Sequence, residues 1–219
     1  MELGNHPPFP ETLDADMDQL SQRILQKLTP GSRLVLGLCG APGAGKSTFA
    51  EQLAAGLGGD NAVVVPMDGF HLGHDVIKDS PKLHRKGAID TFDVSGYRSL
   101  LQRIRAREED VVYAPAYRRG LEEPIAASIA VPKDVPVVIT EGNYLLAPEL
   151  AWLAVRAELD EVWFLETPDE LRLKRLVDRH VRFGKALSQA VEWVRGTDEP
   201  NAEFIRTTRN SADLIIRLG

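Results

Sequence analysis

The sequence predicts an α/β fold, a phosphate-loop domain in which a parallel five-stranded sheet is flanked by helices. Apolar runs of strand length lie at residues 33–40, 62–67, 135–140, 161–165 and 213–217. Helical patterns occupy residues 13–28, 46–59, 95–107, 148–155, 168–182 and 188–209, the last with a break near Pro200. Because helices separate most of the strands, we expect right-handed crossover units and therefore a parallel sheet.

Each element carries its own local signal. The N-terminal helix has an apolar stripe of Leu13, Met17, Leu20, Ile24, Leu25 and Leu28. The run "RLVLGLCG" at 33–40 is continuously apolar, which is typical of a strand buried on both faces. The helix that begins at Lys46 should end at the glycines 58–59. Residues 111–131 predict a small antiparallel hairpin outside the main sheet.

The composition limits the class of protein. The 219 residues fit one domain, 1–219, with the hairpin 111–131 and a helical lid at 168–185 as additions. The net charge of −6 argues against nucleic-acid binding, and no apolar stretch is long enough to cross a membrane. The single cysteine, Cys39, lies in an apolar run, so we expect a buried thiol and a reducing compartment. With an N-terminus unlike a signal peptide, these features predict a cytoplasmic protein.

The strongest functional signal is "GAPGAGKST" at 40–48, which matches G-x-x-x-x-G-K-[ST] between a strand and a helix. Such a loop surrounds a triphosphate with backbone N–H groups and needs glycine at its tight positions. Lys46 would reach the β- and γ-phosphates, and the Ser47 hydroxyl would bind Mg²⁺. We therefore expect a purine triphosphate to be bound by Gly40, Ala41, Pro42, Gly43, Ala44, Gly45, Lys46, Ser47 and Thr48.

Motifs of other phosphate-loop classes are missing. The chain has no N-K-x-D motif for reading guanine and no L-S-G-G motif of transporter ATPases. These gaps disfavour switch GTPases and transporters. A kinase for a small metabolite, a regulatory ATPase with a protein partner and a nucleotide-binding module without catalysis remain as alternatives. An acceptor-like segment at 68–93 favours the kinase.

Two acidic residues follow predicted strands: Asp68 after "VVVPM" and Glu141 after "VPVVIT". In an open α/β sheet, ligands bind at the carboxyl ends of the strands, where the phosphate loop also lies. Transfer to a hydroxyl needs a carboxylate that takes the proton, and oxygen ligands around Mg²⁺. Asp68 suits the first role and Glu141 the second. The alternatives are a turn residue at Asp68 and a helix cap or surface acid at Glu141.

The segment "TPDELRLKRLVDRHVRFG" at 167–184 predicts a helix that opens with a capping box of Thr167 and Glu170. Four arginines recur at steps of 3, 4 and 3 and share one face: Arg172, Arg175, Arg179 and Arg182. Such a row could close over phosphates and offset the charge that develops in transfer, with Arg175 and Arg179 as catalytic candidates. The alternative is a solvated basic face.

Taken in order, several segments resemble the uridine kinase, phosphoribulokinase and pantothenate kinase superfamily. They are "GAPGAGKST", "MDGFH", "RKGAIDTFD", "PAYRRG", "TEGNYLL", "LRLKRLVDRHV" and "NAEFI…ADLII", and they span roughly residues 33–217. The resemblance is closest to a bacterial branch of fructose-transport-associated, fructokinase-labelled, nucleoside/nucleotide kinase-like proteins. It implies an ATP-dependent phosphotransferase that acts on a small-molecule acceptor.

The resemblance also implies roles for individual residues. Asp68 would be the general base, Lys46 and Ser47 would hold ATP·Mg²⁺, and Glu141 would stand near the metal. Asn201 would flank the adenine. The acceptor side would be lined by Asp68, His71, Arg85, Lys86, Asp93, Tyr117 and Glu141.

Two departures from the family pattern concern the acceptor. Uridine kinases tend to carry Asp-Ser-Phe-Tyr where this chain has Asp-Gly-Phe-His at 68–71, which disfavours a nucleoside. Arg118 and Arg119 follow Tyr117, where relatives often carry Asp or Ser. The pair suggests an acceptor with a carboxylate or phosphate, or simply an exposed turn. The predicted acceptor is thus a sugar such as fructose, a pantothenate-like compound or a nucleoside, and the hairpin edge allows a homodimer.

Overall fold

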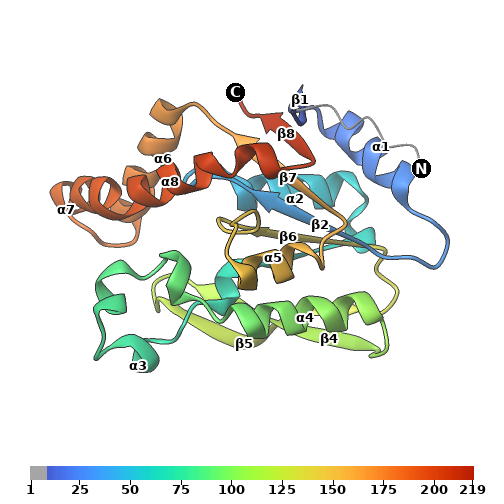
Figure 1. The fold of residues 1–219 in the computed structure, drawn as a ribbon, viewed down its shortest axis with the longest axis horizontal. Helices are drawn as coiled ribbons and strands as arrows, with labels where there is room; N and C mark the ends of the chain where they lie inside the picture. Colours follow the sequence, from blue (N-terminus) through green and yellow to red (C-terminus); the bar gives the residue numbers. More distant parts are fainter. Residues whose placement is uncertain (1–8) are drawn as a thin grey trace.

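The computed structural model describes residues 9–219, and residues 1–8 of the proline-rich N-terminal stretch lie outside the described part. A parallel six-stranded sheet, in the order β1-β8-β7-β2-β6-β3, forms the centre (Figure 1). Its strands are β1 (Glu11–Asp14), β2 (Leu34–Cys39), β3 (Ala62–Pro66), β6 (Val137–Gly142), β7 (Glu161–Glu166) and β8 (Leu214–Arg217). The predicted α/β fold is confirmed, but the sheet has six strands and not five.

The strand that the sequence did not predict is β1, which pairs in parallel with β8 at one edge of the sheet. Its sequence, ETLD, has no apolar alternation, so no pattern separates it from the helix that follows. Helix α1 (Met17–Lys27) begins after Asp16, whose carboxylate accepts a hydrogen bond from the Gln19 N–H at 3.0 Å. The predicted helix start at residue 13 was therefore wrong, and Leu13 belongs to the sheet.

Helices cover both faces of the sheet (Figure 1). On one face, α1 and α2 (Lys46–Gly56) pack in a core that includes Leu20, Leu53 and Trp163. On the other, α4 (Val94–Ala106) and α5 (Leu150–Arg156) pack in a core that includes Tyr97 and Trp152. Strands β2 and β6 lie between these layers and every residue in them is buried, as their apolar runs predicted. In residues 9–219, no helix is both long and apolar enough to span a bilayer.

The predicted hairpin is confirmed as a separate antiparallel sheet of β4 (Val111–Arg118) and β5 (Glu123–Pro132). It packs against the turn Met67–Phe70 at the end of β3. At Gly69 an added Cβ would lie 2.4 Å from the backbone oxygen of Pro115, so only glycine permits this approach. The hairpin is therefore fixed to the turn that carries Asp68. Pairing of its edge with a second copy stays a prediction.

The segment between β3 and α4 contains short helical turns in place of regular elements. They are the 3-10 turn Met67–Phe70, helix α3 (His74–Ile77), and the 3-10 turns Pro81–Arg85 and Ile89–Thr91. An antiparallel bridge between His71 and Phe92 joins the two ends of this segment. The segment thus forms a closed lobe beside the hairpin.

Helices α6 (Asp169–Arg182), α7 (Leu187–Trp193) and α8 (Glu199–Thr207) precede β8. A π-helical segment, Val194–Asp198, joins α7 to α8 just before Pro200. Proline has no N–H for the regular helix bond, and the wider π turn absorbs the break predicted there.

The predicted capping box at the start of α6 was wrong. Helix α6 has no side-chain cap, and the Thr167 hydroxyl instead donates to the backbone oxygen of Ala44 at 2.9 Å. A capping side chain must turn back to its own helix, whereas Thr167 reaches across to the phosphate loop. This hydrogen bond ties the start of α6 to that loop.

Candidate active site

A cavity of about 1320 Å³ contains the candidate site. It lies where the phosphate loop follows β2, where Asp68 follows β3, and where Glu141 stands near the end of β6. The three strands are neighbours in the order β2-β6-β3, so their carboxyl ends meet at one edge of the sheet. The convergence expected from the sequence is present in the fold.

The phosphate loop has the conformation that an anion-binding turn needs. Gly43 and Gly45 have φ angles of 79° and 93°, in the left-handed region, and Gly45 is the N-cap of α2. A Cβ on Gly43 would lie 2.7 Å from the backbone oxygen of Arg172, so glycine also lets α6 pack on the loop. The first N–H groups of α2 have no partner within their own helix, which suits them to phosphate.

Lys46 is buried in this loop. Its Nζ donates to the backbone oxygens of Gly40 (2.8 Å) and Ala41 (3.2 Å) and to Oδ1 of Asn143 (2.6 Å). Burial lowers the pKa of Lys46, and the nearby charge of Glu141 opposes this effect. These bonds hold the ammonium at one place in the loop. The sequence analysis missed Asn143, although its position two residues after Glu141 was a signal that it lies at the same strand end.

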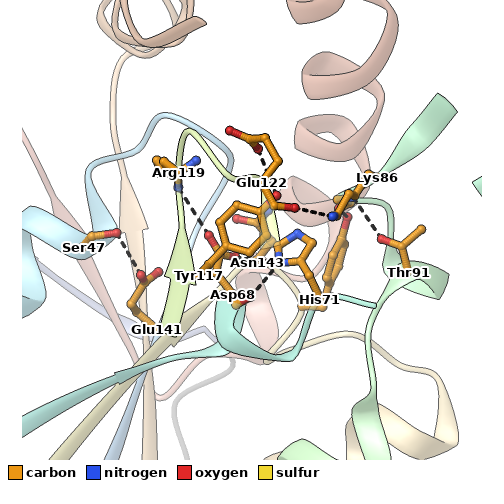
Figure 2. Close-up of polar contacts among 12 residues, drawn as sticks. Ser47, Asp68, His71, Lys86, Thr91, Tyr117, Arg119, Glu122, Glu141 and Asn143 are labelled. Atoms are coloured by element: carbon orange, nitrogen blue, oxygen red, sulfur yellow. Dashed lines mark hydrogen bonds and ion pairs between the residues drawn. The ribbon is translucent and has the colours of Figure 1, made fainter. Parts of the chain in front are cut away.

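Ser47 and Glu141 meet beside the loop (Figure 2). The Ser47 Oγ donates to Glu141 Oε1 at 2.8 Å. Burial raises the pKa of the Glu141 carboxyl, and the neighbouring Asp68 raises it further. A hydroxyl and a carboxylate this close fit Mg²⁺, which prefers oxygen ligands and often takes one or two from protein and the rest from phosphates and water. No group of three His, Cys, Asp or Glu side chains in residues 9–219 could hold a metal ion by itself.

Asp68 lies in the turn after β3 and lines the cavity. Its Oδ2 is 3.4 Å from Nη2 of Arg119, and its Oδ1 is 4.0 Å from Nδ1 of His71 (Figure 2). Its backbone oxygen lies 2.7 Å from the same ring nitrogen of His71, which suits an N–H donor. In residues 9–219 the side chain accepts one hydrogen bond, from Arg119, and none from the backbone of the turn. Asp68 is thus more than a turn residue, since its carboxylate faces the cavity.

Besides Asp68 and Glu141, three more of the predicted acceptor residues line the same cavity: His71, Lys86 and Tyr117. The rings of His71 and Tyr117 lie 4.6 Å apart between centroids, and the Lys86 Nζ lies 5.6 Å from the Tyr117 ring centroid. Lys86 also donates to the backbone oxygen of Glu122 at 2.5 Å. The hairpin and the segment after Asp68 therefore share one wall, which Figure 2 shows.

The structure does not bring Arg85 and Asp93 into this wall. Arg85 forms an ion pair with Asp90 at 2.6 Å, and its side chain is more than half exposed. Asp93 caps α4 by accepting a hydrogen bond from the Gly96 N–H at 2.8 Å. The described lining of the cavity includes neither residue. Both were predicted from a sequence motif. Arg85 instead forms a surface ion pair, and Asp93 caps the start of α4.

The predicted arginine row divides between two environments. Arg175 and Arg179 line the cavity, and Arg175 Nη1 would lie 3.3 Å from a Cβ on Gly45. Burial lowers the pKa of Arg179, and the positive charge of Arg119 lowers it further. Arg182, in contrast, is exposed. The cavity thus has two arginines of α6 near the phosphate loop.

Arg172 is only 1% exposed and has a structural role. Its guanidinium donates to the backbone oxygen of Pro42 and to the carboxylate of Asp169, each at 3.1 Å, and it forms an ion pair with Glu199. It therefore links α6 to the phosphate loop and to the start of α8.

Several known kinases are similar to this chain in sequence or in fold. A solved structure of a proposed fructose transport system kinase from Silicibacter sp. TM1040 is 37% identical, with a TM-score of 0.84 over 92% of this chain and 98% of that one. The ATP-dependent kinase-like protein notR' of Aspergillus versicolor is 33% identical over 65% of this chain and 88% of its own length. A proposed uridine kinase of Schizosaccharomyces pombe, C227.14, is 28% identical over 91% of this chain and 89% of its own. The chain belongs to the P-loop kinase superfamily.

The family of the methylmalonyl Co-A mutase-associated GTPase MeaB matches residues 9–69 of this P-loop kinase. That span holds the phosphate loop and Asp68 but less than a third of the chain. Since the guanine-reading motif N-K-x-D is absent from the sequence, the match is to the phosphate-binding part and does not carry over guanine use.

The lining of the cavity in this kinase also includes Met17 of α1 and Gln52 of α2. Asn201 of α8, the predicted adenine neighbour, lines it as well. So does the pair His180–Asp198, with 2.8 Å between Nε2 and Oδ2. Sequence reasoning missed this pair, because its two residues are 18 positions apart and belong to different helical segments. The role of Asn201 stays a prediction.

We predict that His71 makes this kinase less stable in acid. Burial lowers the pKa of His71, while the charge of Asp68 opposes the shift. Because the folded pKa is below the unfolded value of about 6.5, the stabilising contribution is present above that value and is lost as the pH falls. His71→Gln should therefore show a smaller drop in melting temperature than the wild type between about pH 7.5 and pH 5.5.

Thermal denaturation at the two pH values measures this effect. The matched control is His84→Gln, at an exposed position in the same lobe. Its melting temperature should fall between the two pH values as much as that of the wild type. An equal drop in His71→Gln and the wild type would contradict the prediction. Lys86 and Arg119 also face the His71 ring, and both are present in all three proteins.

Proposed function

We propose that this P-loop kinase transfers the γ-phosphoryl group of ATP to a hydroxyl of a small metabolite. The observation that carries the proposal is the position of Asp68, on the cavity wall between the phosphate loop and the residues His71 and Tyr117. A carboxylate in that place can accept the proton of a bound hydroxyl. The same cavity holds the Lys46 ammonium and two arginines that suit a transferring phosphoryl group.

In the proposed reaction, the acceptor oxygen attacks the γ-phosphorus while its proton passes to Asp68. The bond from the γ-phosphorus to the bridging oxygen breaks, and ADP leaves with that oxygen. Lys46, Arg175 and Arg179 would offset the negative charge on the phosphoryl oxygens. Mg²⁺, when bound by Ser47 and Glu141, would neutralise charge on the β- and γ-phosphates.

We propose a class of acceptors and not one compound. The relatives carry names that point to different acceptors, fructose transport in one case and uridine in another. We therefore propose sugars, pantothenate-like compounds and nucleosides as the range to test. The cavity has room for a nucleotide and a small acceptor together, since ligand sites of about 300–1,000 Å³ hold one drug-sized molecule.

A screen for acceptor-dependent ADP release tests the proposal. The purified chain is incubated with ATP·Mg²⁺ and a library of hydroxyl-bearing metabolites, and products are identified by mass spectrometry. We expect at least one metabolite to accelerate ADP release and to gain one phosphoryl group. ADP release that no metabolite accelerates, but that a protein fraction does, would favour a regulatory ATPase instead.

A further inference from the structure

Arg119, at the tip of the hairpin, has a guanidinium that is largely unused. It lines the cavity, and its side chain is 38% exposed. Within residues 9–219 its one hydrogen bond runs from Nη2 to Asp68 Oδ2, at a long 3.4 Å. A guanidinium has five N–H donors, so most of those on Arg119 are available to a ligand. Figure 2 shows that the side chain points from the hairpin toward Asp68.

The contact with Asp68 competes with the proposed reaction. A general base must accept a hydrogen bond from the acceptor hydroxyl before the proton can move. Arg119 occupies one of the two carboxylate oxygens that could do so. The rest of the carboxylate can still accept the hydroxyl, and the long contact is weak, so an anionic group on the acceptor can take Arg119 over as it binds.

Only some acceptors can draw it away. Carboxylates and phosphates bind a guanidinium through two parallel charge-assisted hydrogen bonds, which a neutral hydroxyl does not match. From this geometry we infer that the acceptor carries a carboxylate or phosphate group, that Arg119 binds this group, and that Asp68 is thereby released for the hydroxyl. The inference rests on the proposed kinase function and narrows its substrate class.

The acidic residues of the hairpin tip are already hydrogen-bonded to groups other than Arg119. The carboxylate of Glu122 accepts from the Tyr117 hydroxyl at 2.9 Å and from the Gly120 N–H at 3.2 Å. The carboxylate of Glu123 accepts from the His74 N–H at 2.8 Å and lies 3.4 Å from Lys86. Lys86 is thus engaged with this pair, whereas Arg119 lines the cavity and has donors to spare.

Arg179 of α6, which lines the same cavity, supports the same conclusion. Burial is the main cause that lowers the pKa of Arg179, and the second is the positive charge of Arg119. Two guanidiniums that repel each other across a cavity are both stabilised by an anion placed between them. ATP supplies one such anion and an anionic acceptor supplies another, so the two sources must be separated by experiment.

The test compares Arg119→Gln with the wild type on matched acceptor pairs. The pairs are glycerate and glycerol, pantothenate and its alcohol, and fructose 6-phosphate and fructose. Arg118→Gln is the matched control, since Arg118 is the adjacent arginine, is exposed, and is not in the described lining of the cavity. The Michaelis constants for acceptor and for ATP are measured, together with ATP hydrolysis without acceptor.

We expect the wild type to prefer the anionic member of at least one pair. In Arg119→Gln the KM for that acceptor should rise roughly 10- to 100-fold, as expected for loss of a hydrogen-bonded charge pair. The KM for ATP should rise much less than the KM for that acceptor, and Arg118→Gln should behave as the wild type.

Three results would overturn the inference or its basis. If the wild type prefers the neutral member of the pairs, the inference of an anionic acceptor is wrong, but the proposed kinase function is not contradicted. An equal rise in the KM for ATP and for every acceptor in Arg119→Gln would assign Arg119 to the nucleotide. ATP binding without transfer to any acceptor would contradict the proposed function itself.

Discussion

Replacement of Asp68 by asparagine should lower acceptor-dependent turnover by roughly 10²- to 10⁴-fold, the usual effect of losing a general base. The amide keeps the shape of the carboxylate but cannot take the hydroxyl proton. Because Asp68 does not contact the phosphate loop through any of its hydrogen bonds in residues 9–219, ATP binding should change little. ADP release at saturating acceptor and calorimetric ATP titration measure the two quantities separately.

Asp75→Asn is the control for this variant. Asp75 lies in the same lobe, its side chain is 90% exposed, and within residues 9–219 it pairs only with Lys78, at the end of its own short helix. Its replacement should leave turnover within about twofold of the wild type. If Asp68→Asn retains turnover within about threefold of the wild type, Asp68 is not the base.

Replacement of Arg172 by alanine should lower the free energy of unfolding by about 3 kcal/mol, because it removes a buried side chain and leaves the Pro42 backbone oxygen without its donor. The guanidinium contacts the phosphate loop at Pro42, the first turn of α6 at Asp169, and α8 at Glu199. Its loss should loosen all three together. Urea unfolding followed by tryptophan fluorescence measures the change.

Arg182→Ala separates this effect from a general loss of positive charge on α6. Arg182 is exposed on the same helix, so its replacement should change the free energy of unfolding by no more than about 0.5 kcal/mol. A third variant, Arg172→Met, keeps most of the buried volume and should be less destabilised than Arg172→Ala. A loss below about 1 kcal/mol in Arg172→Ala would contradict a structural role for this residue.

The divided arginine row shows where prediction from sequence stops. Periodicity placed Arg172 and Arg179 on one face, and that much is a property of the helix. Which of them would be buried depends on the position of α6 against the phosphate loop, and this position is set by contacts such as Arg172 with Pro42. A long, flexible side chain can turn toward the core or the cavity from the same face.

Where a local sequence pattern decides the structure, the structure was predicted correctly. The phosphate loop, the buried strands and the hairpin all follow from glycine spacing and apolar runs. Strand β1 was missed because its only support is pairing with β8, about 200 residues later in the chain. Asp93 was assigned to the acceptor from a motif, whereas its carboxylate caps a helix. Because aspartate is common both as a helix cap and as a ligand-binding carboxylate, the residue type alone does not separate the two roles.

The hairpin β4–β5 shares no strand pairing with the main sheet, and its close contact at Gly69 and Pro115 lies away from its tip. Substitutions at the tip, including Arg119, therefore leave the hydrogen bonds of the central sheet intact. Surface turns of this kind accept sequence change more readily than buried strands do. On the proposed role of Arg119, a change of acceptor needs only a few substitutions in one turn and no change in the strand pairing that positions the phosphate loop.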